Sequence, residues 1–146
     1  MKAKIGIAPI AWSNDDLPEL GGETSLETCL SEAKIAGFMG VETGGKFPKS
    51  SKELKPILDH HEINLCGGWY SGTLLDNDLE DEKLKVRTQM DLFIDLGAPC
   101  LVYGETAGTI QNIRNAPLNS RRILSEEEFK KYGEKITKFF EWCESE

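Results

Sequence analysis

"FMGVETGGKFPKSSKELKPILDHHEINLCGGWYSG", residues 38–72, decides the fold, because it contains a strand, a helix and a second strand in succession. Phe38–Thr43 and Ile63–Gly72 are short, largely apolar runs, which predict buried strands. The segment between them, Ser50–His61, predicts a helix. A strand, a helix and a strand in this order are typical of a parallel sheet with a right-handed crossover.

The same unit recurs on both sides of this stretch. Further strands are expected at Lys4–Ile10 and Pro99–Thr106, and further helices at 24–37, 79–98 and 125–146. No linker, composition shift or low-complexity segment divides the chain. The sequence therefore predicts four strand-and-helix units in a single domain, residues 1–146.

Local signals mark the ends of the helices. A capping box, Ser or Thr followed three positions later by Glu, is expected for Thr24 with Glu27, Ser50 with Glu53 and Ser125 with Glu128. Pro56 should bend or tighten the first turns of its helix. The apolar side chains of the first helix are Leu26, Leu30, Ala33 and Ile35, and those of the third are Leu84, Met90, Phe93, Ile94 and Leu96.

Polar and aromatic residues follow every predicted strand: Trp12 to Asp15, Glu42 to Lys46, Trp69 to Ser71, and Tyr103 to Thr106. In a parallel sheet these clusters lie at the carboxyl ends of the strands, where (β/α)8 barrels build their active sites. An open doubly wound sheet instead concentrates its ligand groups at one switch point. We therefore expect an α/β fold with parallel strands that forms half of a (β/α)8 TIM barrel.

Composition and charge exclude several functions. A formal net charge of −8 and the lack of any Lys/Arg run argue against nucleic-acid binding. No apolar stretch approaches the length of a membrane span or of a signal-peptide core, so a cytoplasmic location without membrane association is expected. The four cysteines lie far apart and predict reduced thiols rather than a zinc cluster. His60 and His61 should point about 100° apart on a helix and are expected to be surface residues.

The segment "ETGGKFPKSS", residues 42–51, raises the question of a phosphate-binding loop. Gly40, Gly45 and Lys46 fit the spacing G-x-x-x-x-G-K, but the motif then requires Ser or Thr to hold Mg²⁺, and Phe47 stands there. The segment is better explained as the rim of a substrate site, in which Gly44 and Gly45 let the chain turn and direct Lys46.

These loops also carry a family resemblance. "WSNDDLPELGGET", "GGKFP", "GGWYSG" and "YGET" resemble segments of myo-inosose dehydratase, a member of the sugar isomerase and epimerase superfamily with the xylose-isomerase-like barrel. The similarity runs from about Lys4 to the end of the chain and covers the N-terminal half of that family's barrel. It implies a lyase that removes water from 2-keto-myo-inositol in inositol catabolism, with a divalent metal such as Mn²⁺ or Co²⁺.

The resemblance also implies what this chain lacks. The family's metal ligands come from the second half of the barrel, so no metal ligand is expected among these residues. Reaction of the keto-cyclitol needs a proton taken from beside a ketone and loss of a β-hydroxyl, which acid–base side chains assist. We expect Lys46 to contact the substrate, with a solvated lysine as the alternative, and Glu42 either to take part in catalysis or to orient Lys46 as an ion pair.

Other residues are candidates for substrate binding. The flat rings of Trp12, Trp69 and Tyr70 suit the C–H face of a cyclitol, although packing at the rim explains them as well. Asn14 and Ser71 can bond to hydroxyls. Glu105 either binds a hydroxyl or pairs with an arginine of the loop 108–124, which is a lid or a mobile surface loop. Gly67 and Gly68 are expected to let a ligand approach.

Other functions remain open. The same superfamily includes ketose isomerases and epimerases, and a DNA-repair endonuclease that the acidic composition disfavours. Four units leave the first and fourth strands as open edges, so self-association is expected. A non-catalytic half barrel that binds a cyclitol or another chain is the alternative from a different class.

Overall fold

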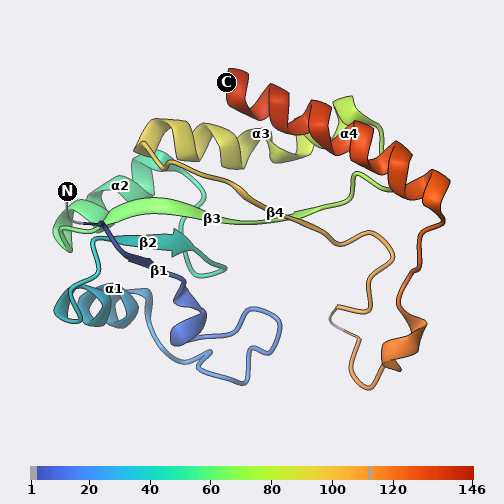
Figure 1. Cartoon of the computed structure of the whole chain (residues 1–146). Helices are drawn as coiled ribbons and strands as arrows, with labels where there is room; N and C mark the ends of the chain where they lie inside the picture. Colours follow the sequence, from blue (N-terminus) through green and yellow to red (C-terminus); the bar gives the residue numbers. More distant parts are fainter. Residues whose placement is uncertain (1–2, 112) are drawn as a thin grey trace. The chain divides into compact units, whose positions relative to one another are not determined.

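The computed structural model describes residues 3–111 and 113–146, where strands and α-helices alternate along the chain (Figure 1). The elements in order are β1 Gly6–Ile7, α1 Leu26–Ile35, β2 Gly40–Thr43, α2 Ser51–His60, β3 Asn64–Gly72, α3 Leu79–Leu96, β4 Val102–Glu105 and α4 Glu126–Ser145. Two short 3-10 turns, η1 Pro9–Ala11 and η2 Leu118–Ser120, precede α1 and α4 respectively. The four predicted strand-and-helix units are confirmed.

The strands form a sheet in the order β1-β2-β3-β4, so each strand lies beside the next one along the chain. The pairings of β1 with β2 and of β2 with β3 are parallel. A doubly wound sheet reverses its strand order at a switch point, whereas consecutive units of a barrel do not. The α/β fold of half a TIM barrel is therefore confirmed.

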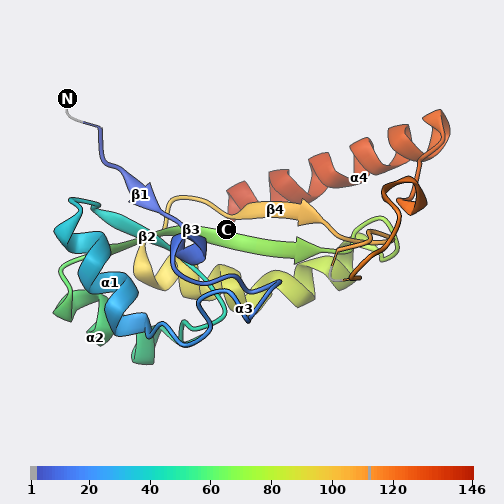
Figure 2. The same ribbon diagram turned by 90° about the horizontal axis from the view of Figure 1, so that it is seen from below.

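The helices near the first strands cover one side of the sheet. Figure 2 shows α1, α2 and α3 on the same side of β1, β2 and β3. The hydrophobic core lies between these layers, and it contains Leu30, Ala33, Val41, Phe47, Leu54, Leu58, Ile63, Leu65, Leu92 and Phe93. Helices on a single side of a parallel sheet are the barrel arrangement, because a barrel keeps its other side for the interior.

Two compact units make up the chain. The first comprises the chain up to Tyr70 together with Thr88–Val102, and the second comprises Ser71–Arg87 and Tyr103–Glu146. The second unit has its own packed centre around Phe139, which is fully buried against Tyr103, Phe140 and Trp142. The prediction of one domain over residues 1–146 stays a prediction.

The strands are shorter than expected where proline and loop geometry interfere. β1 is only two residues long within the predicted Lys4–Ile10, because a 3-10 turn begins at Pro9. A proline lacks the N–H group for a ladder bond, and its fixed φ suits the first position of a helical turn. β4 covers four of the residues predicted for Pro99–Thr106. The predicted positions are right, and the ends differ.

Two of the three predicted N-cap residues, Ser50 and Ser125, are confirmed, and one of the three predicted capping boxes forms. Ser125 and Glu128 form the complete capping box of α4. The N-cap of α1 is Ser25, which accepts from the Thr28 N–H, so the choice of Thr24 was wrong by one position. Ser50 is the N-cap of α2 without a side-chain bond, and the expected box with Glu53 does not form.

Some expected apolar faces are also wrong. Ile35 is 85% exposed, Leu84 75% and Ile94 49%. Met90 and Phe93 are buried as predicted, and Val86 and Leu92 are the further buried side chains of the third helix. Helix α2 runs from Ser51 to His60 through Pro56. Within the described residues, no helix is both long and apolar enough to cross a membrane.

Candidate functional site

The carboxyl end of β2 carries Glu42 on the side of the sheet that faces away from the helices. Val41 is fully buried in the core between sheet and helices, so its neighbour Glu42 points to the opposite side. Burial and, next, the Glu42 charge raise the pKa of the Cys66 thiol on β3. In a barrel this side of the sheet faces the interior, and active sites are built at the carboxyl ends of the strands.

The loop after β2 is joined to the loop after β1 by two hydrogen bonds. The Gly45 N–H donates to Asp15 Oδ2 at 2.7 Å, and Lys46 Nζ donates to the Gly22 carbonyl at 2.6 Å. A Cβ on Gly45 would lie 2.8 Å from Asp15 Oδ1, so a larger residue there would displace the Asp15 carboxylate. The bond to the Gly22 carbonyl holds the Lys46 ammonium group against the loop after β1, and its predicted contact with a substrate stays a prediction.

Among the described residues no ion pair joins Glu42 to Lys46. The ammonium group of Lys46 has three donors, and the bond to Gly22 uses one of them. Asp15 was missed from the sequence, because its role depends on how two loops meet. Its place in the polar cluster after the first strand was the available signal.

The loop between β1 and α1 is held closed by its own side chains. Asn14 Oδ1 accepts from the N–H groups of Asp16 and Leu17, and the Asn14 N–H donates to the Leu20 carbonyl. The partly buried Trp12 donates from Nε1 to Glu32 on α1 at 2.6 Å. The amide oxygen of Asn14 therefore holds the loop, while the ring of Trp12 is anchored at the rim.

The glycines of β3 make room for protein atoms. At Gly67, where φ is +144°, a Cβ would lie 2.6 Å from the Cys100 carbonyl oxygen. At Gly68 a Cβ would lie 1.9 Å from Thr43 Oγ1. The expectation that these two positions leave space for a ligand was therefore wrong, because neighbouring segments fill that space.

The aromatic residues at the end of β3 are accessible to different degrees. Trp69 is 52% exposed, and its carbonyl accepts from Gln89 Nε2 at 3.1 Å. Tyr70 is half-buried and Ser71 is exposed. An exposed indole at a strand end can stack on a sugar-like ring. The roles predicted for these residues stay predictions.

In the second unit, Glu105 at the end of β4 is surrounded by donors. Its carboxylate accepts from the Leu75 N–H at 3.2 Å, the Tyr103 hydroxyl at 3.1 Å and the Ala107 N–H at 2.9 Å. Tyr132 also hydrogen bonds to it. Through these donors the Glu105 carboxylate holds the chain around β4 together.

A buried acid, Glu82, completes this region. Glu82 is fully buried and accepts from Thr73 through both the N–H at 3.0 Å and the hydroxyl at 3.1 Å. Burial, followed by the charge of Glu105, raises the pKa of Tyr132 to about 12, and burial also raises the pKa of Tyr103. Glu82 was missed from the sequence, where it looked like one acid among several in a helix start.

The loop 108–124 is tied at one end. Arg122 pairs with Asp76 at 2.7 Å and approaches Glu128 at 3.8 Å, and Arg121 Nε donates to the Leu118 carbonyl. A Cβ on Gly108, where φ is +67°, would lie 2.9 Å from Arg122 Cδ. These contacts hold the segment Leu118–Arg122, while closure over a ligand stays a prediction.

Two surface depressions lie away from the carboxyl ends of the strands. One of about 430 Å³ is lined by Ser51, Lys52, Lys55, Pro56, Asp59, Asp95 and Leu96. Another of about 230 Å³ lies at the opposite ends of the strands, against Met39 and Asn64. Neither of these two depressions contains a predicted site residue.

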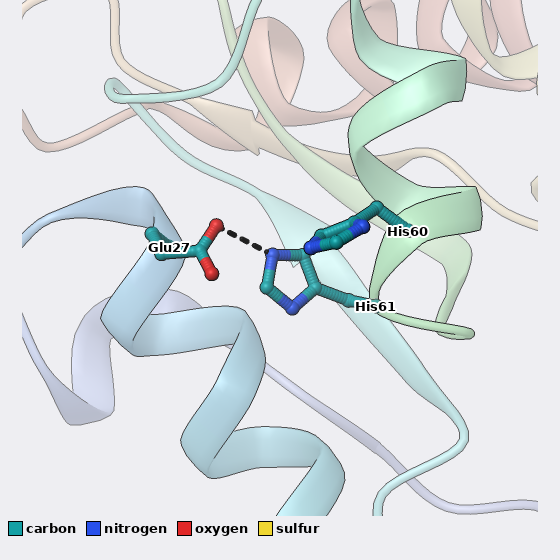
Figure 3. Close-up of side chains that lie close together, drawn as sticks. All are labelled: Glu27, His60 and His61. Carbon is teal, nitrogen blue, oxygen red and sulfur yellow. Dashed lines mark hydrogen bonds and ion pairs between the residues drawn. The ribbon is translucent and has the colours of Figure 1, made fainter.

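The strand ends do not present a metal site. Among residues 3–111 and 113–146, the one group of three potential ligands that converges is Glu27, His60 and His61, on helices α1 and α2 (Figure 3). At the strand ends, Glu42 has no histidine partner and Glu105 is occupied by protein donors. The donors present at the strand ends therefore do not fit the metal that the resemblance implies.

Comparison with known proteins supports the resemblance. The chain is 45% identical over 138 residues to the "Rhizopine catabolism protein MocC" of Rhizobium meliloti, which covers 94% of this chain and 42% of that protein. It is 38% identical over 129 residues to the inosose dehydratase of Geobacillus thermodenitrificans. That alignment covers 88% of this chain and 43% of the relative. For the inosose dehydratase of Clostridium tetani the identity is 36%, over 94% of this chain and 46% of the relative.

The resemblance predicted from the loop motifs is thus confirmed, and it concerns the N-terminal halves of these proteins. No family model matches the chain. The chain spans less than half the length of the curated relatives it matches. The fold and the relatives together define half of a TIM barrel similar to inosose dehydratases.

Proposed function

We propose that this chain supplies the N-terminal half of the active site of a hydro-lyase that dehydrates 2-keto-myo-inositol in inositol catabolism. The observation that carries the proposal is the identity of 36–38% to proteins named inosose dehydratase over about nine tenths of the chain. The position of Glu42 and Lys46 at the carboxyl end of β2 agrees with it, because barrel enzymes place catalytic side chains there.

In this proposal Lys46 binds an oxygen of the substrate. The reaction removes a proton from the carbon beside the ketone and breaks the bond to the β-hydroxyl, which leaves as water after gaining a proton. A lysine ammonium donates a hydrogen bond or a proton to such an oxygen. The bond from Lys46 to Gly22 orients the ammonium group while two donors stay available for the substrate.

Glu42 acts as the acid–base partner at the same strand end. Its carboxylate lies on the side of the sheet away from the core, and the sheet holds its backbone opposite Gly67. A strand position restricts the carboxylate more than a loop would, which favours proton transfer in a fixed direction. Six further residues are proposed to bind the cyclitol: Trp12, Asn14, Trp69, Tyr70, Ser71 and Glu105. Asn14 and Glu105 are proposed to do so chiefly by shaping their loops.

The metal of the whole enzyme belongs to this proposal as well. A divalent ion such as Mn²⁺ or Co²⁺ would polarise the ketone, and its ligands are proposed to come from the other half of the barrel. Among the described residues, the strand ends offer no ligand set for this ion. A cytoplasmic location, with neither nucleic acid nor membrane as partner, is also proposed.

A non-catalytic half barrel is the second candidate. β1 and β4 are the terminal strands of the sheet, and exposed strand edges favour pairing with a further chain. Such a module would bind a cyclitol or a second copy of the chain without turning the substrate over. A ketose isomerase or epimerase of the same superfamily is the remaining alternative.

The deciding experiment measures intact mass and activity together on the protein made from its own gene. A mass about twice the 16.3 kDa of these residues, with conversion of 2-keto-myo-inositol to a product lighter by one water, is the expected result. Lys46→Met should then lower turnover, whereas Lys49→Met, an exposed lysine three positions away, should not. Turnover without dehydration, or a protein of 16.3 kDa without any turnover, would reject the hydro-lyase in favour of the alternatives.

A further inference from the structure

Two neighbouring histidines and a glutamate converge between helices α1 and α2. One ligand atom from each of Glu27, His60 and His61 can be chosen so that all lie within 4.8 Å of one another. His61 Nε2 is 2.8 Å from Glu27 Oε2. Figure 3 shows the two imidazole rings, from the end of α2, turned toward the Glu27 carboxylate on α1.

From this geometry we propose that Glu27, His60 and His61 form a binding site for a divalent transition-metal ion such as Zn²⁺, distinct from the strand ends. Two imidazoles and a carboxylate are a donor set that zinc accepts, with water in the fourth position. The site joins the first turn of α1 to the last residues of α2, so the ion would cross-link two helices.

The convergence of adjacent histidines corrects the sequence-based expectation that they point apart. His60 is the last residue of α2 and His61 is its C-cap, at φ −87° and ψ 0°. The ring centroids lie 5.0 Å apart with an interplanar angle of 81°. The end of the helix therefore brings the two rings close, which successive residues inside a long helix do not achieve as readily.

The three residues differ in burial, and one of them is held in place before an ion binds. The side chain of His61 is 7% exposed and so is held by its surroundings, whereas that of Glu27 is 66% exposed. His60 is exposed and can swing by rotation of its own side chain. One ligand is thus fixed and the other two can adjust, which leaves an open face for the ion to enter and for water to complete its shell.

Binding requires only small movements. Ligand atoms on a tetrahedral zinc ion lie roughly 3.3 Å apart, given bond lengths near 2.0 Å. The 2.8 Å contact of His61 with Glu27 would open by about half an ångström, and the third ligand would close by up to about 1.5 Å.

The test exploits the fact that the chain contains two histidines. Tag-free protein is titrated with Zn²⁺ while imidazole ¹⁵N signals are recorded by NMR. Both histidines should shift together and saturate at one equivalent. The thermal midpoint should rise with free Zn²⁺, because an ion that binds only the folded chain stabilises it.

Variants separate this site from other ligands. His60→Ala and Glu27→Gln should each weaken Zn²⁺ binding by on the order of tenfold or more. Both residues are exposed, so the variants should fold. Glu53→Gln, with the same change of charge in the first turn of α2, is the control and should bind as the parent does.

Cobalt distinguishes the cysteines from the histidines. Co²⁺ at this site should show weak visible bands without the intense thiolate charge-transfer band that ligation by Cys29 would produce. A thiolate band, histidine signals that do not move at one equivalent, or a His60→Ala variant with unchanged affinity would each overturn the proposal. None of these readouts depends on the proposed dehydratase activity.

Discussion

The rim of the first unit and the acid network of the second unit hold their loops in opposite ways. In the first, Asp15 and Lys46 each make one short hydrogen bond to the backbone of another loop. In the second, Glu105 accepts several bonds and Glu82 is fully buried. An acid that satisfies several backbone donors is hard to spare for a ligand, so the comparison predicts a structural role for Glu105, and the chemical role of Lys46 stays a prediction.

The largest expected effect comes from removing the Glu105 carboxylate. Glu105→Ala leaves the N–H groups of Leu75 and Ala107 without their acceptor, and should lower the free energy of unfolding by about 3 kcal/mol. Urea unfolding followed by circular dichroism measures it. Glu144→Ala, at an exposed position near the end of α4, is the control. A loss no larger than that of the control would return Glu105 to the ligand-binding residues.

Removing the Lys46 ammonium should affect activity more than stability. In the active enzyme, Lys46→Met should lower kcat/KM by about 100-fold, the typical loss for one donor to a developing charge. The free energy of unfolding should change by less than about 1 kcal/mol, because Lys46 makes one exposed bond. Steady-state kinetics beside Lys49→Met tests both parts. A large stability loss with normal kcat/KM would reverse the comparison.

Alkaline pH should weaken the second unit. Burial raises the pKa of Tyr132 from 10.0 to about 12, so the folded state favours the neutral phenol. The resulting stability is complete below pH 10 and is lost as the pH rises toward 12. Tyr132→Phe should remove about 1 kcal/mol of this pH dependence, allowing for partial exposure.

Unfolding in urea at a series of alkaline pH values measures this effect. Tyr103, whose pKa burial also raises, keeps part of the dependence in the Tyr132→Phe variant. The same slope with and without Tyr132 would show that the phenol is not held neutral by the fold.

The smallest effect is expected at Asp15. Asp15→Asn keeps the shape but weakens the bond from the Gly45 N–H, so stability should fall by about 0.5–1 kcal/mol. Hydrogen exchange of the Gly45 amide should become several-fold faster. Glu23→Gln, an exposed acid of the same loop region, should leave that amide unchanged. Equal exchange in both variants would mean that the two loops are held together by other contacts.

The order of elements could be predicted because it depends on local pattern. Apolar runs, caps and glycine stops are written in neighbouring residues, and Ser125 with Glu128 forms the capping box that its spacing indicates. Where a start depends on one position, as with Thr24 and Ser25, spacing alone cannot choose between two hydroxyl residues. The exposure of Leu84 and Ile94 depends on which side of α3 meets the rest of the chain.

The candidate site was predicted less completely, since its geometry depends on contacts between distant segments. The positions of Glu42 and Lys46 follow from the end of a strand, and the sequence indicates them. The bonds of Asp15 to Gly45 and of Glu82 to Thr73 require loops to meet, and no spacing encodes that. The approach of His60 to His61 depends on the helix ending between them.

The sequential strand order has a consequence for synthesis on the ribosome. Each strand pairs with the next one made, so the partners of β1 and β2 have all been translated once Gly72 has left the exit tunnel. Pairings this close in sequence form quickly compared with the seconds that translation of the remaining residues takes. The first strands can therefore pair while the later residues are still being added, and a ribosome stalled at a point where Gly72 has emerged from the tunnel would carry nascent chain that already resists protease.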